Sequence, residues 1–206
     1  MTELFISAFV TLFVIIDPPG CAPIFASLTA GAPASHRRAM AIRSVMVAAS
    51  ILFAFSIFGE AFLGALGVSL DAFRIAGGIM LFIIALEMVF EKRTERRENR
   101  AQDVIASEPE DISVVPMGIP MIAGPGSIAS GMLLTSRSNG LTESLIVYGA
   151  LASVLVLTLL CLLIAGPLMK FIGHQLEAMI TRILGVILAA LAAQFVIDGI
   201  KASFLV

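Results

Sequence analysis

The chain has 206 residues, of which 59% are hydrophobic and 14% are charged, and its mean hydropathy is +1.03. A soluble domain carries nearer a quarter charged residues, so this composition excludes an ordinary soluble fold. The net charge of −2 says little about partners, but the sequence has no basic stripe that would suggest a nucleic-acid partner. A bilayer core about 30 Å thick requires roughly 20 mostly apolar residues per helix. The sequence contains several long stretches without a charged residue, which predict a multi-pass protein of the lipid bilayer.

Six apolar spans follow one another along the chain. They cover about 3–30, 39–59, 70–90, 113–136, 143–166 and 179–204, and proline and glycine interrupt the first and the fourth. Their apolar runs are continuous, without the alternation of a β-strand, so the predicted fold class is all-α. The charged stretch after the third span is most simply a solvated loop or a helix extension. One membrane domain then comprises a three-helix repeat (1–90), a charged cytoplasmic loop (91–112) and a second three-helix repeat (113–206).

Related motifs in the two halves indicate an internal repeat. Asp17–Thr29 (DPPGCAPIFASLT) aligns with Ala123–Thr135 (AGPGSIASGMLLT) at an offset of 106. Arg74–Ile79 (RIAGGI) aligns with Arg182–Ile187 (RILGVI) at an offset of 108. Because three spans per half is an odd number, the second copy must enter the membrane from the opposite side. The predicted architecture is a 3+3 inverted repeat with broken helices one and four.

The loop charges predict the orientation, because Lys and Arg concentrate on the cytoplasmic side. Placing both termini outside puts ten of the thirteen basic residues inside: Arg37, Arg38, Arg43, Lys92, Arg93, Arg96, Arg97, Arg100, Lys170 and Arg182. We therefore expect an inner-membrane protein with both termini on the outer side.

The breaks in spans one and four follow from their prolines. Proline removes a backbone donor and disfavours helix at the residue before it, so the sequence Asp17-Pro18-Pro19-Gly20 cannot continue a helix smoothly. Pro23 would suit the first turn of a new half-helix. The second copy repeats the pattern with Pro120 and Gly124-Pro125-Gly126, restarting near Ser127. Leu4–Ile16 spans about 20 Å as a helix, so the first break lies inside the membrane.

Such breaks suggest a binding site. Opened backbone at membrane depth is tolerated only where protein or a watery cavity satisfies it, and paired interruptions in inverted halves point to a transporter's substrate site. The N-termini of the restarted half-helices suit a carboxylate, while Asp17 suits an ammonium group, Na⁺ or a proton. Together they suit a small zwitterion. The plainer alternatives are a proline kink used in packing and an Asp17 side chain that only caps its own helix.

The remaining glycine and polar residues indicate helix packing or have no specific predicted role. Gly77, Gly78 and Gly185 are spaced for close helix contact, and Glu87 would extend toward the headgroups. Gln194 would line a cavity or bond between helices. Among the chemistry-bearing motifs, H-E-x-x-H, G-x-S-x-G and metal-ligand spacings are missing from the sequence, so we expect no enzyme, no metal and no cofactor beyond a coupling H⁺ or Na⁺.

The motifs IIDPPGCAPIF, PMGIPMIAGPGSIASGM and FRIAGGIMLFIIALEM together resemble the MarC/SnatA family of integral membrane proteins. The resemblance covers essentially the whole chain and implies six helices and kinship with LysE-type exporters. For the SnatA branch it implies ion-coupled transport of small neutral amino acids such as glycine and alanine. The substrate-lining positions it implies are Asp17, Pro18, Pro19, Gly20, Cys21, Gly124, Pro125, Gly126 and Ser127.

The function predicted from the sequence is therefore a secondary transporter for a small neutral solute, working by alternating access of the two halves. Asp17 would bind the amine or carry the coupling proton. A channel is the nearest alternative, since broken helices also line pores. A non-transporting membrane assembly protein is a third. Whether the chain forms a homo-oligomer stays open at this point.

Overall fold

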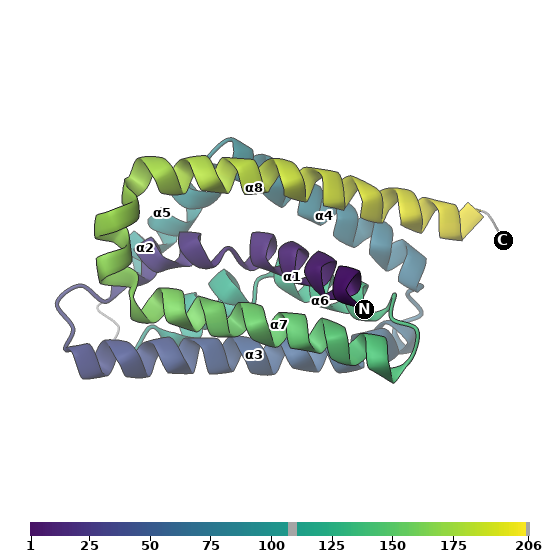
Figure 1. The fold of residues 1–206 in the computed structure, drawn as a ribbon, viewed down its shortest axis with the longest axis horizontal. Coiled ribbons are helices and arrows are strands. Elements are labelled where there is room, and N and C mark those ends of the chain that lie inside the picture. The colour runs from purple at the N-terminus through teal and green to yellow at the C-terminus, as the bar shows by residue number, and fades with distance from the viewer. Residues whose placement is uncertain (107–110, 205–206) are drawn as a thin grey trace.

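The computed structural model describes the backbone of residues 1–106 and 111–204, and the side chains of residues 1–103, 111–167 and 178–204. Within these ranges every regular element is a helix (Figure 1). The elements are α1 (Thr2–Ile16), α2 (Pro18–Leu28), α3 (Ala34–Ala65), α4 (Leu70–Val89), α5 (Lys92–Ala106), η1 (Ser113–Ile122), α6 (Pro125–Thr135), α7 (Leu141–Leu163) and α8 (Ala165–Phe204).

The six predicted spans correspond to elements of the structure. Five stretches are long and apolar enough to cross a bilayer, namely 2–28, 34–65, 70–89, 141–163 and 178–204. The bent pair η1–α6 brings the number to six, with 53° between its two helices. The first stretch is α1 followed by α2, which are separated at Asp17. The structure thus confirms an all-helical polytopic fold in which the first and fourth spans are broken.

Corresponding helices of the two halves run in opposite directions (Figure 1). The first span starts at the end of the bundle that holds both termini and runs toward the end that holds α5, which we call the α5 end. The η1–α6 pair runs the other way, and α3 with α7 and α4 with α8 are opposed in the same manner. This is the arrangement that an inverted repeat produces.

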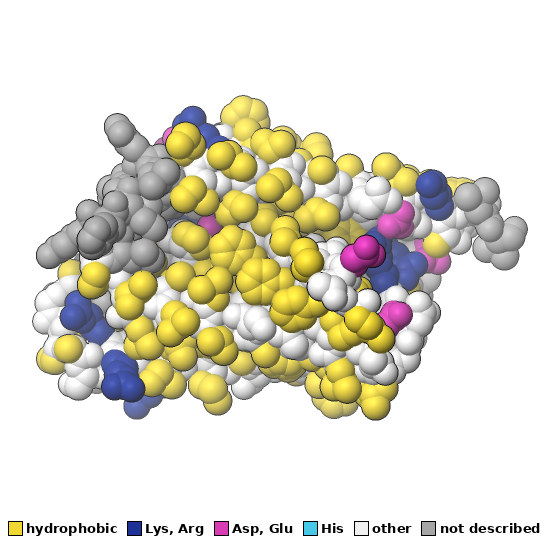
Figure 2. Space-filling view, in the orientation of Figure 1, with side chains coloured by type: hydrophobic (Ala, Val, Ile, Leu, Met, Phe, Trp, Pro, Cys, Tyr) yellow, Lys and Arg dark blue, Asp and Glu magenta, His cyan; other side chains and the backbone are white. Residues whose placement is uncertain are grey.

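The outer surface is apolar where a bilayer would contact it. On the face shown in Figure 2, hydrophobic side chains cover the middle of the molecule and charged side chains gather toward its two ends. Large side chains such as Phe58, Phe62 and Val186 are more than half exposed. Soluble monomers rarely expose contiguous apolar surface on this scale, whereas lipid tails solvate it without cost.

Close packing of α4 against α8 depends on the predicted glycines. A Cβ atom at Gly78 would lie 2.7 Å from Val196 Cγ2 and 2.9 Å from the carbonyl oxygen of Ala192. A Cβ atom at Gly185 would lie 2.9 Å from Met88 Cβ. Gly77 instead faces α6, where its Cβ would stand 3.0 Å from Leu133. Each of the three glycines thus lies at a close contact with a neighbouring helix.

The charged stretch after the third span, for which we expected a solvated loop or a helix extension, is a separate helix with two buried arginines. Residues 92–106 form a helix, α5, and the side chains of Arg93 and Arg97 are only 7% exposed. Residues 107–110 of the predicted loop lie outside the described part of the chain. The burial has an electrostatic cause, because both arginines bind polar groups at the two helix breaks.

The packing of α4 on α8 gives a first prediction. Gly78→Ala should lower the unfolding temperature of the purified protein, because overpacking a tight contact against backbone typically destabilises by about 1–3 kcal/mol. Gly149→Ala in α7 is the matched control, since a Cβ there meets nothing within 4 Å. The control should be neutral or stabilised by about 0.5–1 kcal/mol, the helix preference of Ala over Gly. Equal unfolding temperatures for the two variants would contradict the packing role.

Candidate functional site

The first break is centred on Asp17, which has the left-handed conformation (φ 58°, ψ 66°). Its backbone N–H closes α1 by donating to the carbonyl of Phe13. Its side chain begins α2, because Oδ1 accepts a hydrogen bond of 3.1 Å from the backbone N–H of Gly20. Pro18 occupies the first helical position, where a missing N–H matters least. The new half-helix therefore begins five residues before Pro23, earlier than expected, and Pro23 lies inside it.

The second break lies at Gly124, just ahead of Pro125. The segment before it, η1, is not a regular helix, since Val115 and Ile119 have extended backbone conformations. Gly124 is the N-cap of α6 and has no side chain, so no side chain caps this helix start. A Cβ atom at Gly124 would come within 2.6 Å of the carbonyl oxygen of Pro120, which leaves glycine as the residue that fits.

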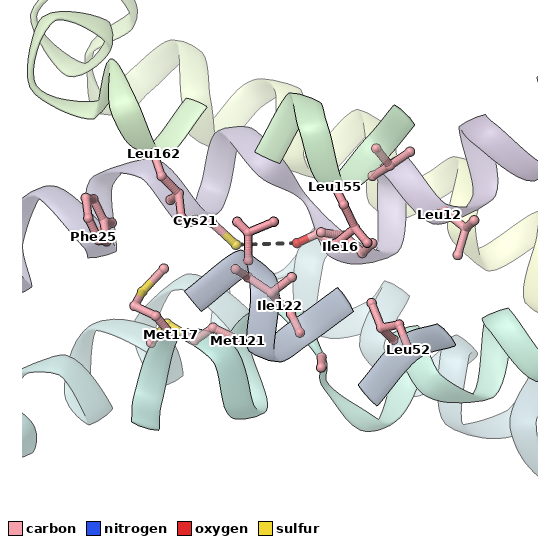
Figure 3. Close-up of a cluster of buried hydrophobic side chains, with 14 of the residues drawn as sticks. Leu12, Ile16, Cys21, Phe25, Leu52, Met117, Met121, Ile122, Leu155 and Leu162 are labelled. Carbon is pink, nitrogen blue, oxygen red and sulfur yellow. Dashed lines mark hydrogen bonds between the residues drawn. The ribbon is translucent and has the colours of Figure 1, made fainter. Parts of the chain in front are cut away.

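One hydrogen-bond pattern recurs at both breaks. Cys21 Sγ donates to the carbonyl oxygen of Ile16 at 3.5 Å, as Figure 3 shows. Ser127 Oγ donates to the carbonyl oxygen of Ile122 at 2.8 Å. Each pair is separated by five residues, and the two pairs are 106 positions apart, the offset of the predicted repeat. A side chain at the same repeat position thus satisfies the carbonyl that each break releases.

The two breaks meet, and a buried arginine joins them. Arg97 Nη1 lies 2.9 Å from Asp17 Oδ2, with side-chain exposures of 8% and 2%. Arg97 Nη2 also donates to the carbonyl oxygen of Met121 at 3.5 Å. A single guanidinium group therefore contacts the first break and the residue three positions before the second. In Figure 3 the apolar neighbours Ile16, Cys21, Met121 and Ile122 gather around the same junction.

A second arginine of α5 satisfies the end of α1. Arg93 Nη2 donates to the carbonyl oxygen of Ile15 at 2.6 Å, and Nη1 approaches Met88 Sδ at 2.9 Å. Burial, and then repulsion from Arg97, lowers the pKa of Arg93 to about 10. The group is still a cation at neutral pH. Two like charges are thus held close together in a largely apolar surrounding.

Sequence reasoning missed Arg93 and Arg97, although a signal was present. The two residues are four positions apart, and Ala101 is four further on, so all three share one face of α5 and all three are buried. An acid inside an apolar span also requires a counter-ion. The densest run of cations in the chain is the stretch that forms α5.

The predicted site residues are placed as follows. Gly20 packs against the Asp17 carboxylate so closely that a Cβ would overlap it. Gly126 packs against Ile84 of α4, with only 2.7 Å available to a Cβ. A small hollow beside α5 is lined by the predicted residues of the second break, Gly124, Pro125, Gly126 and Ser127. The predicted residues of the first break, Asp17, Pro18, Pro19, Gly20 and Cys21, do not line it. The structure brings the two breaks together, but only the second borders this opening.

Other polar residues have partners outside the junction. Glu87 Oε1 pairs with Arg96 Nη1 of α5 at 2.7 Å instead of extending free toward the headgroups. Gln194 donates to Asp198 on its own helix at 2.7 Å, and Asp198 pairs with Arg137 at 2.6 Å. Across the described residues, no group of three or more His, Cys, Asp or Glu side chains is arranged to hold a metal ion.

Comparison with known proteins finds relatives that match nearly the whole chain. A family model described as "MarC family integral membrane protein" matches residues 2–204. A UPF0056 membrane protein of Methanocaldococcus jannaschii is 37% identical over 203 residues, covering 98% of both chains. The UPF0056 membrane proteins YvbG of Bacillus subtilis and YhcE of Escherichia coli are 33% and 32% identical and cover 99% and 95% of this chain, and 97% and 91% of their own lengths.

No solved structure matches the chain. The match to the family model, the relatives of equal length and the apolar, six-span helical fold agree with one another. The chain therefore belongs to the MarC family of integral membrane proteins.

Proposed function

We propose that this protein is a secondary transporter for a small zwitterionic solute, such as a neutral amino acid, and that it works by alternating access of its two inverted halves. The observation that carries the proposal is the junction of two broken helices from opposite halves at one buried ion pair. Broken helices at matching positions of inverted repeats are the usual place for a transporter's substrate.

The Asp17–Arg97 pair supports a zwitterion as the solute. Burying two charges costs free energy of desolvation, and a buried ion pair adds little stability over a well-packed apolar pair. A functional role would explain why the two charges are buried here. An amino acid could offer its ammonium group to Asp17 and its carboxylate to Arg97. One internal ion pair would then be exchanged for two, with no charge left unpaired. A solute with a single charge would leave Asp17 or Arg97 without a partner.

The contacts of helix α5 support a transport cycle that includes a state in which the junction of the two breaks is closed at the α5 end. Its two buried arginines bind the last carbonyls of α1 and η1 as well as Asp17, so it covers both breaks. Release of these contacts would open the junction toward the α5 end. By the distribution of Lys and Arg, we expect that end to be cytoplasmic.

Asp17 also supports a role in coupling. A proton on its carboxylate would remove the charge that holds Arg97, and a bound Na⁺ would compete with Arg97 for the same oxygens. Either event would weaken the hold of α5 on the junction. An ion gradient could therefore bias the closed and open states through this one group.

The transport role predicts the behaviour of Asp17 variants. Asp17→Asn should abolish gradient-driven uptake of glycine or alanine into proteoliposomes. It should also destabilise the fold by about 3–5 kcal/mol, because a buried Arg97 loses its counter-charge. Asp17→Asn/Arg97→Gln removes both charges and should recover most of the unfolding temperature without recovering uptake. Parental uptake by this double variant would rule out the proposed role of the pair.

Two controls complete this experiment. Asp71→Asn removes a carboxylate whose pair with Arg74 is partly exposed, and uptake should survive it. Counterflow of labelled glycine should saturate with concentration, as expected of a carrier. Single-channel currents in its place would favour a pore.

The closing role of α5 predicts the reactivity of Cys21, which is fully buried beside the pair. In a Cys161→Ala background, a membrane-impermeant thiol reagent applied to the α5 end should label Cys21 slowly. Arg97→Gln should raise the labelling rate at least about tenfold, the effect of losing about 1.4 kcal/mol from the closed state. Arg96→Gln breaks the pair between the half-exposed Arg96 and Glu87 and should change the rate little. Equal rates for the two variants would count against closure by α5.

A further inference from the structure

A small hollow lies between α5 and the start of α6. Its volume is about 60 Å³, enough for a carboxylate group or a small inorganic anion. One wall is made by the second break, including Gly126 and Ser127. The other wall is made by four arginines of α5, namely Arg93, Arg96, Arg97 and Arg100.

Positive charge around this hollow exceeds the negative charge that the described residues supply. Arg97 pairs with Asp17 and Arg96 pairs with Glu87. Arg93 contacts a carbonyl oxygen and a thioether sulfur, both of which are neutral. Arg100 forms no ion pair with any side chain that the structure describes. Among the side chains that the structure describes, these four guanidinium groups form ion pairs with two carboxylates, those of Asp17 and Glu87.

The N-terminus of α6 is a second feature that favours an anion in this hollow. In the first repeat, the carboxylate of Asp17 caps the start of α2 through Gly20. In the second repeat, Ala123 and Gly124 stand in this region, and no side chain caps α6. The positive end of the helix and the four arginines border one hollow, and both favour an anion there.

We propose that this hollow is an anion site for a carboxylate, which would do for α6 what Asp17 does for α2. The planar group would accept hydrogen bonds from the guanidinium groups on one side and from the first turn of α6 on the other. Arg96 and Arg100 are the specific ligands of this site, because both are exposed beside the hollow, whereas Arg93 and Arg97 are buried against α1 and Asp17. The site does not depend on transport, although the carboxylate of a zwitterionic solute is one anion that fits it.

Thermal unfolding of the purified full chain tests the site with acetate as the probe. Chloride is replaced by acetate at constant total salt, in nanodiscs of zwitterionic lipid only. The unfolding temperature should rise with the logarithm of the acetate concentration, as for any ligand of the folded state. Arg96→Gln/Arg100→Gln should lose this response while keeping the Asp17–Arg97 pair.

Arg37→Gln/Arg38→Gln is the matched control, because it removes two exposed arginines of α3 at a distance from the hollow, and it should respond like the parent. An equal acetate response in both double variants, or no response in the parent, would overturn the proposal. Nanodiscs with an anionic lipid form a further arm. Stabilisation by that lipid but not by acetate would assign the arginines to headgroups and would likewise overturn it. Because uptake is not measured, failure here is distinguishable from failure of the transport proposal.

Discussion

Backbone groups released inside a bilayer must find partners within the protein, and this requirement governs the arrangement around the two breaks. The N–H of Gly20 is taken by Asp17, and the carbonyls of Ile16 and Ile122 are taken by Cys21 and Ser127. The carbonyls next to these are reached from α5. Charged side chains enter an apolar bundle here because only they are long enough and rich enough in donors to serve two helix ends at once.

This requirement also explains why α5 is a helix against the bundle when its composition resembles a solvated loop. Among its described side chains, those of Arg93, Arg97 and Ala101 are buried and share one face. The opposite face keeps the exposed charges that the composition suggested. Exposed and buried charged side chains thus alternate along residues 92–103 with the period of a helix.

Much of the fold could be predicted from the sequence, because lipid imposes length and apolarity on each span. The six spans, the breaks in the first and fourth, and the glycine contact of α4 with α8 all follow from such patterns. The exact restart at Pro18 did not follow, since Asp17 can both end one helix and begin the next only in a left-handed conformation. The partner of Asp17 did not follow either, because eighty residues separate it from Arg97 and periodicity carries no information over that distance.

The unequal chemistry of the repeats has a consequence for motion. A protein built from two inverted copies has, by symmetry, two end states of equal energy that differ only in which side is sealed. Here one copy has Asp17 where the other has Ala123, and the ion pair with Arg97 of α5 forms at the first break. If the two halves exchange as proposed, this degeneracy is lifted, because closing the α5 side forms a salt link through Asp17, whereas alanine at the matching position of the second break cannot form one. The exchange would then start from an intrinsic preference for one side, before a solute or a gradient acts.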